Sequence, residues 1–294
     1  MTDAQTAIEI IPSGAPLGAE VRGVDLSQPI DDATFRTIER AYAEHGVLVF
    51  RDQHLTERQL VAVTERFGEV EEYVRSTFAM PDHPEIILIT NIEKGGEFVG
   101  VADAGTTWHT DMSYIPAPPR GSLLYAREVP VKDGTVLGDT LFSSTAAAYD
   151  DLPDATKTLL EGRRTVHSYE GKHARRAKAG KSNRKPLTEE ERASLPPVDH
   201  PVIRTHPQSG RKCIYVVAGE CVGITGMSDA EAEPLLEDLA ARCTRPEYTY
   251  RHHWQRYDLV MWDNCLVQHL AIHDYALPQR RMMWRTTIMG SVPA

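Results

Sequence analysis

The spacing of hydrophobic positions changes near Trp108. Before it, residues 31–45 and 56–68 place apolar side chains at helical spacing between polar ones, so each stretch predicts an amphipathic helix. The apolar runs 47–52 and 84–90 are too short for typical helices and predict buried strands. The first third of the chain therefore combines helices with short strands.

After Trp108, short apolar runs alternate with turn signals, which is typical of a sandwich or barrel. Two longer stretches, 144–162 and 228–243, predict helices. The pattern as a whole predicts an α+β fold in which helices pack around a β core. The strand-like runs are 121–129, 139–144, 164–170, 202–207, 212–217, 248–254, 258–264 and 282–290.

Composition narrows the function classes. The chain has 294 residues, 41% hydrophobic and 25% charged, which is ordinary for a soluble globular protein. We find no apolar run of membrane-spanning length, no signal peptide, no repeat and no long linker, and so expect one cytoplasmic domain over residues 1–294 without a membrane partner. A net charge of -10 argues against nucleic acid as a partner. The four cysteines form no CxxC pair, so we expect free thiols.

One segment departs from this acidic background. Residues 171–185 contain seven lysines and arginines and no acidic residue. Such a segment is typical of a solvated or disordered loop. Alternatively, it is a mobile lid whose charge attracts an anionic ligand. We predict a basic mobile loop and leave its role open.

Metal-binding chemistry is indicated by the stretch WHTDMSY at residues 108–114. In a strand, His109 and Asp111 would share one face, because side chains alternate with period two. A third ligand could come from residues 258–275, where His269 and His273 are candidates. Two histidines and one carboxylate suit non-haem Fe(II) with open positions, and they also suit zinc.

A second feature lies in the strand-like run near the C-terminal end. Arg281 and Arg285 are four residues apart and would share a strand face. Their neighbours, among them Met283 and Trp284, are apolar, so these arginines are expected to have anionic partners. Guanidinium groups hold carboxylates in bidentate fashion, which predicts an acid-binding site.

Together these features resemble the taurine dioxygenase/2,4-dichlorophenoxyacetate dioxygenase (TauD/TfdA) group of Fe(II)- and 2-oxoglutarate-dependent oxygenases. The likeness covers nearly the whole chain, and the HxD motif and His269 are 160 residues apart, as is typical of the group. It rests on residues 17–30, 45–56, 66–70, 108–111, 138–144, 262–275 and 280–290.

The resemblance implies a double-stranded β-helix (jelly-roll) core with flanking helices, and a homodimer or homotetramer. It implies Fe(II) held by His109, Asp111 and His269, with 2-oxoglutarate and O2 as cosubstrates. Arg281 matches the arginine that pairs with the distal carboxylate of 2-oxoglutarate, and Thr140 matches that carboxylate's hydrogen-bonding partner.

The implied reaction oxidises an unactivated C–H bond of a small carboxylate, sulfonate or phosphonate, with release of succinate and CO2. Arg285 matches the arginine that holds the acidic group of the prime substrate. Residues 71–80 lack the histidine that contacts sulfonate in the taurine enzyme, which disfavours taurine, and Tyr73 and Arg75 are candidate replacements.

Two other function classes remain compatible with the residues. A zinc hydrolase or cupin-like isomerase could use the same three ligands. A non-catalytic protein that binds small acids could use the same scaffold, although such a protein would be free to lose the ligands.

Overall fold

The structure is a computed structural model that describes residues 8–73, 76–178 and 187–294. Its largest unit is an eight-stranded mixed sheet in which β2 and β3 run parallel and the other neighbours antiparallel. In order across the sheet, the strands are β1 (Glu9–Pro12), β2 (Ala19–Arg22), β3 (Val47–Phe50), β18 (Leu259–Asp263), β8 (Gly121–Glu128), β20 (Met282–Ile288), β5 (His83–Thr90) and β4 (Ala79–Met80).

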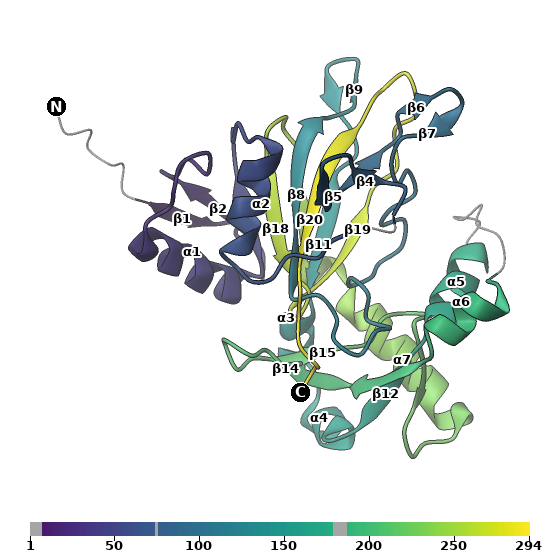
Figure 1. The fold of residues 1–294 in the computed structure, drawn as a ribbon. Helices are drawn as coiled ribbons and strands as arrows, with labels where there is room; N and C mark the ends of the chain where they lie inside the picture. The colour runs from purple at the N-terminus through teal and green to yellow at the C-terminus, as the bar shows by residue number, and fades with distance from the viewer. Residues whose placement is uncertain (1–7, 74–75, 179–186) are drawn as a thin grey trace.

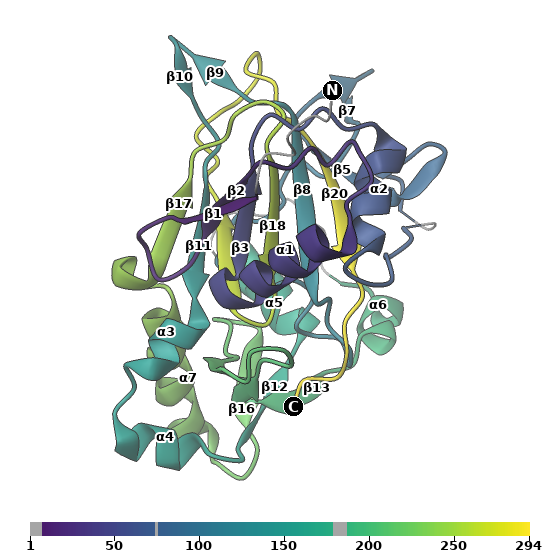
Figure 2. The same ribbon diagram turned by 90° about the vertical axis from the view of Figure 1, so that its left-hand side faces the viewer.

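Helices α1 (Asp32–His45) and α2 (Glu57–Glu65) cover the outer face of this sheet (Figures 1 and 2). Helix α1 begins and ends as predicted: Asp31 caps its first turn, and Gly46, with φ 68°, ends it. Helix α2 begins after Thr56 as predicted but ends at Glu65, three residues before the predicted end at Gly68. The inner face packs against a three-stranded sheet of β17 (Thr249–His252), β11 (Thr140–Ser144) and β19 (Val267–Ala271).

Strand β3 shows why the central strands are apolar without alternation. Leu48 and Phe50 belong to the cluster under α1 and α2, whereas Val47 and Val49 belong to the cluster between the two sheets. All four side chains are buried because both faces of the strand are covered. The large sheet therefore forms a rigid wall against which the inner side chains are held.

The remaining elements form a layer below the sheets in Figure 1 with its own apolar core. It contains the sheet β13 (Val198–Pro201), β12 (Arg164–His167) and β16 (Cys221–Ile224), and the pair β14 (Ile203–Thr205) and β15 (Lys212–Ile214). Its helices are α3 (Thr145–Asp150), α4 (Asp154–Leu160), α5 (Tyr169–Lys178), α6 (Glu189–Ser194) and α7 (Asp229–Cys243), with the 3-10 turn η1 (Pro246–Tyr248). Two hairpins, β6 (Glu93–Lys94) with β7 (Glu97–Phe98) and β9 (Val131–Lys132) with β10 (Thr135–Val136), complete the described elements.

Three local predictions need correction. The helix predicted over 144–162 is two helices, because Pro153 removes a backbone donor and disfavours helical backbone at the residue before it. The strand predicted over 164–170 ends at His167. The loop predicted over 171–185 is helical up to Lys178, as part of α5, and residues 179–185 lie outside the described residues.

The α+β class agrees with the sequence-based prediction. Within the described residues, none of the helices combines the length and the apolar character needed to cross a membrane.

Candidate active site

His109 and His269 meet through their backbones, although 160 residues separate them. Each donates its N–H to the carbonyl of the other, at 3.1 Å and 2.8 Å, and their rings lie 4.2 Å apart between centroids. His269 belongs to β19, where it lies opposite Phe142 of β11. His109 forms an isolated bridge, so the strand predicted around it is reduced to a single pair.

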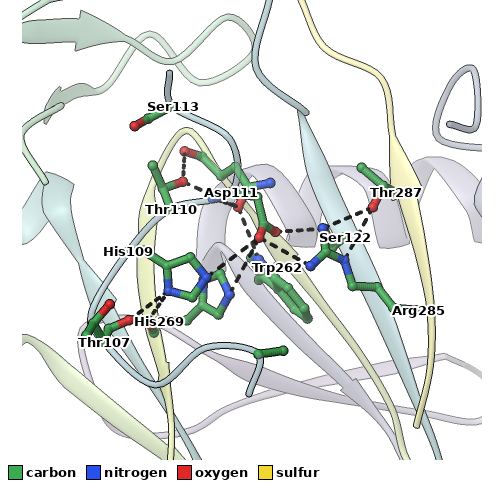
Figure 3. A network of polar contacts seen from close by, with 12 residues as sticks. Thr107, His109, Thr110, Asp111, Ser113, Ser122, Trp262, His269, Arg285 and Thr287 are labelled. Atoms are coloured by element: carbon green, nitrogen blue, oxygen red, sulfur yellow. Dashed lines mark hydrogen bonds and ion pairs between the residues drawn. The ribbon is translucent and has the colours of Figure 1, made fainter. Parts of the chain in front are cut away.

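Asp111 lies in a turn after this bridge, and not in the strand that the HxD spacing predicted. Asn264, in the turn between β18 and β19, accepts a hydrogen bond from the Thr110 hydroxyl on its carbonyl at 3.0 Å. Trp262 Nε1 donates to the Asn264 side-chain oxygen at 3.1 Å, which fixes that amide. The turn still directs Asp111 toward both histidines (Figure 3).

The three side chains converge as candidate metal ligands. Asp111 Oδ1 lies 3.8 Å from His109 Nε2 and 3.9 Å from His269 Nε2, too far for hydrogen bonds. One donor atom from each residue lies within 4.8 Å of the others. A divalent ion about 2.1 Å from each donor fits separations of this size. The residues therefore fit a metal ion.

Protonation states also suit metal binding. Burial, followed by the charge of His269, lowers the pKa of His109 to about 3, and burial lowers the pKa of His269 to about 4. Both imidazoles are neutral at pH 7. His109 Nδ1 lies 2.8 Å from the Thr107 carbonyl, so it carries the proton and leaves the Nε2 lone pair free.

Asp111 is an anion despite its burial. Burial raises its pKa, but the charges of Arg285 and of the two histidines outweigh burial and hold the pKa below its ordinary value. Its Oδ2 accepts a hydrogen bond from the Ser122 hydroxyl at 2.9 Å, and Arg285 Nη1 lies 3.4 Å from its Oδ1. The sequence predicted an anionic partner for Arg285, and within the chain that partner is Asp111.

Arg281 immediately precedes β20, the strand that carries Arg285, and it lies in a different environment. Its side chain is 3% exposed, and its Nε has no hydrogen-bond partner among the described residues. The guanidinium lies 5.9 Å from the ring centroids of both Trp254 and Tyr275. Burial lowers the pKa of Arg281. A buried cation with an unpaired donor fits an acidic ligand.

Thr140 reaches the same region through Trp254, whose Nε1 donates to the Thr140 hydroxyl at 3.1 Å. Thr140 lies on β11 and Arg281 lies beside β20. Both side chains are near the indole ring of Trp254.

A cavity of about 270 Å³ opens beside the candidate ligands. Tyr73 lines it, and its hydroxyl donates to Thr287 Oγ1 at 2.6 Å. Burial raises the pKa of Tyr73 to about 12, so the phenol stays neutral. Arg75, the other predicted substrate residue, lies outside the described residues. His109, Asp111 and Arg285 also line the cavity.

Sequence reasoning missed several residues of the site. The roles of Ser122 and Asn264 carried no signal, because neither residue type by itself indicates a contact with a metal ligand or with its neighbours. Lys172 and His173 of α5 also line the cavity. The basic composition of residues 171–185 was the one available hint, and it did not indicate which lysine faces the site.

Comparisons with known proteins agree with this geometry. Residues 9–287 match the family described as "Taurine catabolism dioxygenase TauD, TfdA family". The chain is 30% identical to (S)-phenoxypropionate/alpha-ketoglutarate-dioxygenase of Delftia acidovorans, over 97% of this chain and 96% of that protein. It is 32% identical to the alpha-ketoglutarate-dependent sulfate ester dioxygenase of Pseudomonas putida, over 97% and 91%.

A solved structure is similar over the same extent. The crystal structure of AAD-2 in complex with Mn(II) and N-oxalylglycine aligns with a TM-score of 0.78 and 32% identity, over 98% of this chain and 99% of that chain. These findings favour the dioxygenase interpretation over the hydrolase, isomerase and binding-protein alternatives. The chain therefore belongs to the TauD/TfdA family of 2-oxoglutarate-dependent (alpha-ketoglutarate-dependent) dioxygenases.

Proposed function

We propose that this protein uses Fe(II), 2-oxoglutarate and O2 to oxidise a C–H bond of a small organic anion, releasing succinate and CO2. The observation that carries the proposal is the convergence of two neutral imidazoles and one carboxylate, and the same chain holds a buried arginine whose Nε has no hydrogen-bond partner among the described residues. When bound, iron and its cosubstrate supply the oxidising chemistry, and the chain supplies binding, orientation and exclusion of water.

In this proposal His109, Asp111 and His269 hold the iron. The Thr107 carbonyl fixes the His109 tautomer, and Ser122 and Arg285 fix the two oxygens of Asp111. Such supporting contacts orient the ligands before metal arrives. The two facing sheets that carry these residues would constitute the double-stranded β-helix core.

Arg281 and Thr140 would bind the distal carboxylate of 2-oxoglutarate. The guanidinium offers a charged fork to that carboxylate, and the Thr140 hydroxyl can donate a further hydrogen bond while it accepts one from Trp254. Both groups come from sheet strands or their ends, which are rigid supports for a cosubstrate.

The prime substrate would occupy the cavity beside the ligands. Arg285 and Tyr73 line it, and the apolar side chains of Ile87, Ile89 and Val101 form part of its wall. Relatives named for phenoxypropionate and for sulfate esters support a substrate with an acidic group and an apolar body. The apolar wall would exclude water from the reacting carbon.

Anaerobic reconstitution tests this function. One equivalent of Fe(II) should bind, and addition of 2-oxoglutarate should produce a visible charge-transfer band. A panel of phenoxy acids, alkyl sulfates, sulfonates and phosphonates should then include substrates that couple O2 uptake to succinate release. Binding of Fe(II) without any response to 2-oxoglutarate would contradict the proposal.

We also propose a cytoplasmic location and a homodimer or homotetramer. All four cysteines are buried and free, which suits a reducing compartment. Phe98, Val131 and Val136 are exposed apolar side chains on hairpins at one end of the molecule (Figure 1), which suits a contact between copies. Light scattering coupled to size-exclusion chromatography measures the oligomeric state directly.

A further inference from the structure

Helix α5 brings two polar side chains to the wall of the cavity that adjoins the candidate metal ligands. Lys172 and His173 both line it, together with His109 and Asp111. The Lys172 side chain is only 15% exposed, which is unusual for a lysine. The basic segment of the sequence therefore places one of its charges inside the site, and that charge requires an explanation.

The Lys172 ammonium is held in place by neighbouring groups. Its Nζ lies 3.0 Å from Glu220 Oε1 and 5.0 Å from the centroid of the Tyr114 ring. Glu220 is 2% exposed, and its other oxygen accepts a hydrogen bond from the Ser113 hydroxyl at 2.8 Å. Glu220 occupies one of the three N–H donors of the ammonium, so the cation retains capacity for a further acceptor.

His173 presents a buried polar atom to the same wall of the cavity. Its Nε2 is buried and has no hydrogen-bond partner among the described residues. Buried polar atoms are nearly always paired, so this nitrogen points to a group that the described residues do not supply. The rings of Tyr114 and Tyr169 lie 4.8 Å apart and line the same cavity.

Arg285 reaches the cavity from the sheet side, whereas Lys172 reaches it from α5. Lys172 lines this cavity together with His109 and Asp111, so the ammonium is near the candidate metal ligands. An anion in the cavity would thus experience positive charge from two walls.

We propose that Lys172 is a specificity residue that binds the acidic group of the prime substrate from the α5 side, with Tyr114 and Tyr169 contacting its apolar body. This inference rests on the proposed function of the site and adds a second cation to Arg285. It assigns the substrate to organic acids with a flat or extended apolar portion. The competing explanation is that Lys172 and Glu220 form an ion pair that only attaches α5.

The test compares each acid with its uncharged amide. Wild type, Lys172→Met and Lys172→Arg are loaded with Mn(II) and N-oxalylglycine and titrated calorimetrically with 2-phenoxypropionate, hexanesulfonate and their primary amides. Lys157→Met is the matched control, because Lys157 also lies over a tyrosine ring, that of Tyr149 at 5.4 Å, but on α4 away from the cavity.

Wild type should bind at least one acid tenfold or more tightly than its amide. Lys172→Met should lose most of that preference, Lys172→Arg should retain a large part, and Lys157→Met should leave it unchanged. If Lys172→Met unfolds, Lys172→Gln takes its place, with melting temperatures recorded for every variant.

Two results overturn the inference: a wild type without preference for either acid, and a Lys172 variant that weakens acid and amide by the same factor. The second result is what a purely structural ion pair predicts. Failure of the proposed function is separable, because it would appear as absence of N-oxalylglycine binding to the metal-loaded wild type.

Discussion

Two buried clusters in this molecule contain metal-binding residue types, and they differ in whether their donor atoms are free. His109, Asp111 and His269 form one cluster, and His206, Asp263 and Cys265 form the other. In the first, no pair of these side chains is within hydrogen-bonding distance, and a cavity adjoins them. The donor atoms of the first cluster thus face space that an ion can occupy.

The second cluster is already satisfied by the protein. His206 Nδ1 accepts the Ser209 N–H at 2.9 Å, and His206 Nε2 lies 3.0 Å from Asp263 Oδ2. Asp263 Oδ1 accepts the Cys265 N–H at 2.7 Å, and burial raises the pKa of the Cys265 thiol well above its ordinary value. Proximity of suitable residues therefore does not make a metal site; unoccupied lone pairs are also required.

The largest expected effect is loss of metal binding when a ligand of the first cluster is replaced. Asp111→Ala or His269→Ala should lower Fe(II) affinity by roughly 100-fold or more, since even supporting partners of metal ligands contribute about 10- to 100-fold. Substrate-coupled succinate release should fall to background. Anaerobic metal titration and a succinate assay measure both. Near-wild-type turnover in either variant would remove the triad assignment.

The next largest effect is expected from substitution of Arg281, on the binding of 2-oxoglutarate. Arg281→Met should weaken 2-oxoglutarate binding by roughly 30-fold or more, because loss of a buried charged partner costs about 2–5 kcal/mol. Titration of the charge-transfer band gives the Kd. Arg280→Met is the control, since Arg280 is exposed and pairs with Glu128 at 3.0 Å on the surface. An equal change in both variants would mean that Arg281 has no specific role.

A substitution in the second cluster should lower the stability of the protein without changing its metal content. Asp263→Asn should lower the free energy of unfolding by about 1.5–3 kcal/mol, because it weakens a buried, charge-assisted hydrogen bond to His206. The iron stoichiometry should stay at that of the wild type. Denaturant unfolding and metal analysis test the two parts. Asp32→Asn, at an exposed ion pair with Arg66, should change stability by less than about 1 kcal/mol. Loss of iron from Asp263→Asn would make the second cluster part of a metal site.

The smallest effect concerns pH and a histidine outside both clusters. Burial, followed by the charge of His200, lowers the pKa of His167 to about 3, against about 6.5 in an unfolded chain. Between these values the unfolded state binds the additional proton, so the free energy of unfolding falls as pH decreases from about 6.5.

From pH 7.5 to 5.5, His167 should account for about 1 kcal/mol of that loss. His167→Gln should show a correspondingly smaller dependence on pH in denaturant unfolding. His54→Gln, at an exposed histidine, controls for removal of a histidine as such. Equal pH dependence in His167→Gln and wild type would contradict the assignment.

How far prediction from sequence succeeded depends on the range of the interactions. Helix α1 was predicted well, because Asp31, the apolar spacing and Gly46 all act within one or two turns. The helix α5 was missed, because its mean composition is polar and the charge of Lys172 is paired with Glu220, 48 residues away in the sequence. Local patterns carry no information about such a partner.

The candidate site shows the same division. The types and spacing of His109, Asp111, His269, Arg281 and Arg285 were readable from the sequence. The structure brings His109, Asp111, His269 and Arg285 together and places Arg281 beside Trp254. The expectation that His109 and Asp111 would share a strand face was wrong in its geometry, since Asp111 lies in a turn. Long-range contacts from Asn264 and Arg285 direct its carboxylate instead.

The sequence by itself determined the elements with strong local signals, such as α1, the side chains that can bind a metal or an acid, and the family that the chain resembles, because these depend on residue type and short spacing. Only the tertiary structure decided that His109 and His269, 160 residues apart, pair through their backbones. It also decided that Arg285 faces Asp111 and that Lys172 lines the cavity. Those features depend on packing between sheets and α5, which no local pattern encodes.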